Sequence, residues 1–106
     1  MNRPGPTDRE TTWSRWLAQE LRGEAEARTF DGSRCDVLTA THAIEVEWVK
    51  KWQEAVGQCL LYAAAFNRKP KIILLTRGKD TEEIYYLRAL AVCNKGGIEL
   101  ETVSTR

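Results

Sequence analysis

Three acidic residues in the first half of the chain have the spacing of a metal-binding site. Asp36 lies in a short apolar run, and Glu45 and Glu47 follow it on either side of a valine. In an extended strand, side chains at i and i+2 project from the same face, so Glu45 and Glu47 point together. Carboxylates held that close repel one another unless a hard divalent cation lies among them. If a neighbouring strand brings Asp36 beside them, the three form a site for Mg²⁺ or Mn²⁺; the alternative is a solvated strand face with ordinary surface carboxylates.

Length and composition indicate one folded domain. The chain has 106 residues, 42% of them hydrophobic, and a formal net charge of +1, so any phosphate binding must come from local clusters of charge. No apolar run is long enough to span a bilayer, and the N-terminus does not resemble a signal peptide. The three cysteines lie far apart among apolar residues, which predicts buried, reduced thiols in a cytoplasmic protein. We expect residues 1–6 to be a disordered lead-in and residues 7–106 to form a single domain.

Periodicity and turn signals predict eight elements in the order α-β-β-β-α-β-α-β. Thr7 and Glu10 have the spacing of a capping box at the start of the first helix. The apolar run 72–75 is typical of a strand buried on both faces. The predicted helices cover residues 8–22, 51–66 and 80–93, and the predicted strands cover residues 25–30, 34–39, 43–48, 72–75 and 98–103.

This order and these acidic residues resemble the PD-(D/E)XK nuclease superfamily, which includes many restriction enzymes, Holliday-junction resolvases and RecB-type exonuclease domains. In that resemblance Asp36 takes the place of the first aspartate, and Glu45 that of the second acidic residue. Cys35 stands where the motif has proline, and Glu47 where it has lysine. The resemblance implies an α/β fold with a restriction-endonuclease-like core, α-β-β-β-α-β, followed here by an added C-terminal α-β. It also implies a mixed central sheet flanked by helices.

The resemblance further implies which groups hold the metal ion. Asp36 and Glu45 would bind Mg²⁺ or Mn²⁺ directly, together with the backbone carbonyl of Val46. Glu20 is a further candidate, because many family members carry an acidic residue on the first helix and Glu20 continues the helical spacing of Trp13. The alternative is that the helix turns slightly and Glu20 reaches solvent. Glu24 and Glu26 are rivals with poorer placement.

Polar residues on the second predicted helix are expected to complete the site. Gln58 and Tyr62 match the Gln-x-x-x-Tyr motif of RecB-type members, and on a helix they share one line with Lys51. We expect Gln58 to act in catalysis, Tyr62 to face substrate, and Lys51 to supply the positive charge that Glu47 cannot. The alternative is that these residues only mark the edge between the buried and solvated faces of an ordinary amphipathic helix. Further basic residues near this helix are candidates for contacts with phosphates: Lys50, Lys51, Arg68 and Lys69.

The sequence therefore predicts a cytoplasmic, Mg²⁺-dependent deoxyribonuclease, an endonuclease with DNA as its partner. Little of the chain lies outside the minimal core, so recognition of DNA shape, a homodimer or a partner protein would select the substrate. One rival is a catalytically inactive nuclease-like domain that binds DNA or protein, and the missing proline and lysine are its evidence. Another is a plain α/β interaction module in which the carboxylate pattern is accidental.

Overall fold

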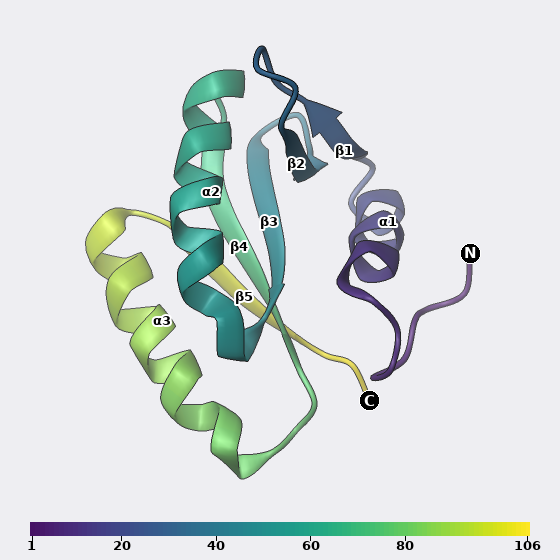
Figure 1. Ribbon diagram of the computed structural model, residues 1–106, viewed down its shortest axis with the longest axis vertical. Coiled ribbons are helices and arrows are strands. Elements are labelled where there is room, and N and C mark those ends of the chain that lie inside the picture. The colour runs from purple at the N-terminus through teal and green to yellow at the C-terminus, as the bar shows by residue number, and fades with distance from the viewer.

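A five-stranded mixed sheet with three helices forms the fold in the computed structural model, which describes all residues 1–106 (Figure 1). The predicted order of elements is confirmed, and the strands lie in the sheet in their order along the chain. Short 3₁₀ turns precede the second and third helices, at Val49–Lys51 and Asp80–Glu82. The elements are α1 (Glu10–Glu20), β1 (Glu24–Arg28), β2 (Arg34–Leu38), β3 (His42–Trp48), α2 (Trp52–Phe66), β4 (Lys69–Thr76), α3 (Glu83–Gly96) and β5 (Glu99–Ser104).

The pairing of the strands changes direction in the middle of the sheet. Strands β1, β2 and β3 form an antiparallel meander, whereas β3, β4 and β5 run parallel. Parallel neighbours need a crossover connection, and α2 and α3 provide the two crossovers. Both helices cover one face of the sheet, and α1 covers the other face over β1 to β3 (Figure 1).

Two apolar layers hold the helices on the sheet. On one face Trp13 and Leu17 of α1 pack against Ile44 and Val46 of β3. On the other face α2 and α3 pack against β4. The run Ile72–Leu75 of β4 is buried on both faces, as its continuous apolar sequence predicts. The three cysteines are free and buried, as expected. None of the helices is both long and apolar enough to cross a lipid bilayer.

The start of the chain differs from the expectation. The predicted capping box does not form, because α1 begins at Glu10 and its N-cap, Arg9, makes no side-chain capping bond. Asp8 instead accepts a hydrogen bond from the Gly5 amide at 2.7 Å. Residues 1–6, expected to be a disordered lead-in, lie against α1: the Trp13 indole donates to the Gly5 carbonyl, and the Arg3 guanidinium lies over the Trp13 ring. The Glu10 side chain is thereby free to point elsewhere.

Two glycines give a matched test of the packing. A methyl group on Gly23 would meet the Leu38 carbonyl oxygen at 2.7 Å, whereas one on Gly57, on the exposed side of α2, would meet nothing within 4 Å. We expect Gly23→Ala to lower the free energy of unfolding by about 1–3 kcal/mol, and Gly57→Ala to raise it by about 0.5–1 kcal/mol. Thermal denaturation followed by circular dichroism checks both, at about 4–8 °C per kcal/mol. A Gly23→Ala protein as stable as the wild type would contradict this close approach of α1's end to β2.

Candidate metal site

The candidate site lies where β2 and β3 separate. Backbone pairing joins Val37 to Ile44 and Leu38 to Ala43, but no pairing joins the next opposed residues, Asp36 and Glu45. Their carboxylates take over the hydrogen bonding. The Asp36 amide donates to Glu45 Oε2 at 2.9 Å, and the Val46 amide donates to Asp36 Oδ2 at 2.9 Å. These two crossed bonds fix both carboxylates between the strands.

Glu45 and Glu47 share one face of β3, as their alternation predicts. They lie beside Ile72 and Leu74 in the parallel register of β4, and those two residues pack into the apolar layer under α2. Ile44 and Val46 pack on the opposite face, against α1. Both glutamates are buried, with only 2% of Glu45 and 9% of Glu47 exposed. A carboxylate costs several kcal/mol to bury without a partner, roughly, so these positions require compensation.

A fourth carboxylate, Glu10 at the start of α1, joins this cluster and was not singled out from the sequence. Its pKa is raised to about 9, first by burial, then by a hydrogen bond with Glu47, then by the negative charge of Glu47, Asp36 and Glu45. The signal was available, because Glu10, Trp13 and Leu17 are spaced i, i+3 and i+7 along the buried stripe of α1. The same helical spacing that suggested Glu20 as a ligand also includes Glu10, one turn before Trp13.

The pKa values describe a site rich in negative charge and poor in counter-charge. Burial and the Asp36 charge raise the pKa of Glu45 to about 8. Burial also raises the pKa of Asp36 to about 6, against the opposing effect of its bond from the Val46 amide. None of Glu10, Asp36, Glu45 and Glu47 takes part in an ion pair. Protons therefore neutralise part of the cluster near pH 7.

The donor set suits a hard divalent cation. It consists of carboxylate oxygens with backbone groups nearby, which is the chemistry that Mg²⁺ and Mn²⁺ prefer. No three acidic, histidine or cysteine side chains already stand as a ligand shell. One oxygen each of Asp36 and Glu45 accepts from a backbone amide. The donors thus fit the ion by type, and binding would replace the protons that the raised pKa values retain.

Glu26 of β1 lies beside this cluster. It has a φ of 54°, an uncommon left-handed conformation for a residue other than glycine, within a strand. Its negative charge contributes to the raised pKa of Asp36. Arg15 of α1 approaches the Glu26 carboxylate to 3.6 Å, so this fifth carboxylate, unlike the other four, has a cationic partner.

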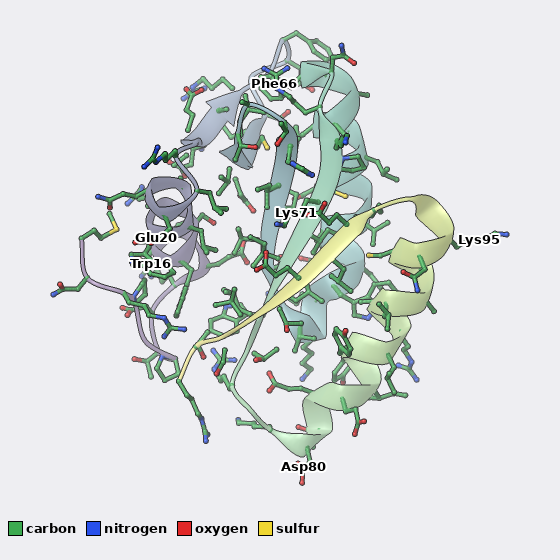
Figure 2. All side chains as sticks on the ribbon, turned by 180° about the vertical axis from the view of Figure 1, so that it is seen from behind. Trp16, Glu20, Phe66, Lys71, Asp80 and Lys95 are labelled. Carbon is green, nitrogen blue, oxygen red and sulfur yellow. The ribbon has the colours of Figure 1, made fainter.

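Glu20 lies outside the cluster, so the expectation that it joins the metal ligands is not met. It is exposed at the end of α1, ten residues and about 15 Å of helix from Glu10, and Figure 2 shows it on α1 near Trp16. The reason is the rotation of the helix. Trp13, Leu17 and Ala18 face the sheet, and this stripe leaves Glu20 in solvent.

The line of residues expected on α2 is divided by the packing of that helix. Ala55 and Tyr62 are buried, whereas Lys51 and Gln58 are exposed. Tyr62 packs against Cys35 and Ala43, which makes it a core residue and not the substrate contact that the motif suggested. Gln58 and Lys51 are free to meet a ligand from solvent.

The predicted basic contacts also separate into two groups. Lys50, Lys51 and Lys69 are exposed. Arg68 is engaged within the protein instead: its Nη1 donates to the Phe66 carbonyl at 2.7 Å and its Nε to the Thr39 carbonyl at 3.3 Å. Arg68 therefore caps the end of α2, with its Nε and Nη1 engaged within the protein.

The raised pKa values predict how stability depends on pH. Unfolded, Glu10 and Glu45 release their protons near pH 4.5, whereas the folded protein retains them up to about pH 9 and 8. Between these limits the folded state binds more protons, so the free energy of unfolding falls as pH rises. We expect the melting temperature in EDTA to drop by at least ~4 °C between pH 5 and pH 9. Glu10→Gln should reduce this drop and Glu20→Gln, on the same helix, should not. A drop of equal size in both variants would contradict the coupling of Glu10 to the cluster.

Comparison with known proteins gives two relatives, both from Acanthamoeba polyphaga mimivirus. The chain is 32% identical over 93 residues to the putative KilA-N domain-containing protein L32, a match that covers 88% of this chain and 24% of L32. It is 30% identical over 70 residues to the putative KilA-N domain-containing protein R878, covering 64% of this chain and 19% of R878. The chain thus spans about a quarter or less of the length of these relatives. No family model and no solved structure matches the chain.

Proposed function

We propose that this protein is a metal-dependent deoxyribonuclease that hydrolyses DNA phosphodiester bonds internally, with a restriction-endonuclease-like core. The observation that carries the proposal is the cluster of four buried or half-buried carboxylates that has no cationic partner: Glu10, Asp36, Glu45 and Glu47. Mg²⁺ or Mn²⁺, held by Asp36, Glu45 and the Val46 carbonyl, supplies an activated water and neutralises charge on the scissile phosphate when bound.

The crossed hydrogen bonds position the two principal ligands. The amides of Asp36 and Val46 each hold one carboxylate oxygen of the opposite strand. The second oxygen of each carboxylate receives no backbone hydrogen bond, and an ion would replace the proton that the Asp36 and Glu45 side chains share. The bonds hold Asp36 and Glu45 side by side, and reorientation of the neighbouring carboxylates would complete the ligand shell when the ion binds.

Glu10 and Glu47 provide a proton-transfer pair where the nuclease motif has a lysine. The pKa of Glu10, raised to about 9, keeps this carboxyl protonated at neutral pH while it is hydrogen-bonded to Glu47. Glu47 can accept a proton from the attacking water, the hydrogen bond with Glu10 lets the two carboxyl groups share that proton, and the leaving oxygen takes its proton from solvent. Exposed Lys51 and Gln58, at the start and middle of α2, contact the substrate from outside.

The relatives support DNA as the substrate. Both mimivirus proteins are named for a KilA-N domain, and KilA-N denotes a DNA-binding domain family. We further propose that specificity comes from the shape of DNA, from a second copy of the chain or from a partner protein. These assignments, and a cytoplasmic location, stay predictions.

A second function is favoured by one observation. Asp36 and Glu45 already satisfy backbone amides, and no ligand shell is assembled in their present orientation. The same residues would serve a catalytically inactive nuclease-like domain, in which the crossed bonds only hold β2 and β3 together. Such a domain would bind DNA or protein without cleaving it.

Metal binding and cleavage, measured on the same variants, separate these functions. We expect Mg²⁺-dependent cleavage of duplex DNA that EDTA abolishes and that Asp36→Asn and Glu45→Gln each reduce by more than about 100-fold. Amide side chains keep an oxygen for the backbone bonds, so folding should persist. The control is Glu20→Gln, which removes an exposed carboxylate outside the cluster and should cleave like the wild type.

If cleavage is absent, isothermal titration of the protein with Mg²⁺ distinguishes the remaining explanations. Saturable binding that is lost in Glu45→Gln, without cleavage, identifies the inactive domain. If the protein neither binds Mg²⁺ nor cleaves DNA, the carboxylates have only a structural role. Cleavage by Glu45→Gln at the wild-type rate would overturn the site itself.

A further inference from the structure

A second polar site adjoins the carboxylate cluster at the ends of β3 and β4. It is a cavity of about 450 Å³ lined by six residues, of which three are basic. Its basic members come from the turn after β3 and from the loop after β4, so the fold brings together charges that are far apart in the sequence. The lining residues are Lys50, Arg77, Lys79, Thr81, Glu82 and Tyr85.

The one acidic member of this lining is already engaged. The Glu82 carboxylate accepts hydrogen bonds from the Arg77 amide at 3.0 and 3.1 Å and from the Lys79 amide at 2.9 Å. These bonds fix the loop between β4 and α3 and hold the Glu82 carboxylate against the backbone, although its negative charge remains. Lys50 and Lys79 are exposed and belong to no ion pair. The cavity lining thus carries three positive charges against the one negative charge of Glu82.

Arg77 is held in place by two contacts. Its guanidinium carbon lies 3.7 Å from the centre of the Trp48 ring, and its Nε donates to the Pro6 carbonyl at 3.1 Å. Both terminal nitrogens of the guanidinium make no hydrogen bond within the protein. A guanidinium fixed on an aromatic ring with its outer fork free is well prepared for an anion with two oxygens in one plane, such as a phosphate.

Short lengths of chain connect the cavity to the carboxylates. Lys50 follows Glu47 by three residues, so their Cα atoms are within about 11 Å even if the chain is fully extended. Pro6, which bonds Arg77, precedes Glu10 by four residues. About 11 Å is the axial length of roughly three base steps of duplex DNA. One strand of DNA can therefore reach both sites.

We propose that this cavity binds a backbone phosphate of the same DNA strand that places a phosphodiester, within about three base steps, at the carboxylate cluster. The position of the second phosphate rests on the proposed function, but binding at the cavity needs no cleavage. Arg77 grips two phosphate oxygens, and Lys50 and Lys79 add charge from either side. The cavity gives a chain of net charge +1 a local site for a polyanion beside an acidic centre.

Binding of a fluorescein-labelled 16-base-pair duplex, measured by anisotropy in EDTA so that no cleavage occurs, tests this assignment. The test variant is the double substitution Lys50→Ala with Lys79→Ala, whose side chains are exposed. The control is Arg28→Ala with Lys95→Ala, which removes the same charge from exposed positions at the end of β1 and near the end of α3. Figure 2 shows Lys95 near the end of α3, far from Asp80 in the turn that precedes α3. Melting curves of both variants confirm folding.

We expect the test variant to bind at least about tenfold more weakly at 0.1 M salt, and the slope of log affinity against log salt to become shallower by about 1.8, for two lost contacts at ~0.9 each. The control should change affinity less than about threefold.

Duplexes with 5′-hydroxyl and with 5′-phosphate ends separate the two sources of phosphate. An equal loss of affinity for both duplexes assigns the cavity to internal phosphodiesters, and a loss of affinity for the phosphorylated duplex alone contradicts that assignment. Equal affinity of test variant, control and wild type overturns the proposal, whether or not the protein cleaves DNA.

Discussion

The crossed hydrogen bonds from the Asp36 amide to Glu45 and from the Val46 amide to Asp36 are the constraint on which the site depends. Side-chain oxygens replace ladder bonds at the point where β2 separates from β3, so the same interaction closes the sheet and fixes two carboxylates in a buried position. An apolar residue at either place would leave a buried amide without an acceptor. The acidic residues are therefore part of the fold as well as of the candidate chemistry.

This arrangement has an electrostatic cost that the rest of the protein does not remove. Glu10 and Glu47 approach the same pair, and no arginine or lysine forms an ion pair with any of the four. Like charges in a partly desolvated site are tolerated only when protons or a cation neutralise them. Burial and the neighbouring carboxylates raise the pKa of Glu10 and of Glu45 above the usual range, so protons neutralise the cluster when no ion is bound. A divalent ion would do so more completely.

Positive and negative charges are also separated along the sheet. The acidic cluster occupies the gap between β2 and β3, while Lys50, Arg77 and Lys79 surround the cavity at the ends of β3 and β4. Trp48 lies at the boundary, next to Glu47 in sequence and under the Arg77 guanidinium. The near-neutral total charge thus conceals two local fields of opposite sign, which is the pattern required to hold a phosphate chain while a cation is retained beside it.

The sequence by itself determined the features that depend on neighbours along the chain. The order of elements, the shared face of Glu45 and Glu47 and the two-sided burial of β4 follow from local periodicity, since a strand or helix repeats its faces whatever surrounds it. Tertiary structure decided which residues meet. The rotation of α1 places Glu10, and not Glu20, in the carboxylate cluster. The packing of α2 on the sheet buries Tyr62. The loop after β4 supplied Arg77 and Lys79, which no motif marked. Helical spacing defines a stripe, but only the packing of that stripe on the sheet fixes where it begins and ends.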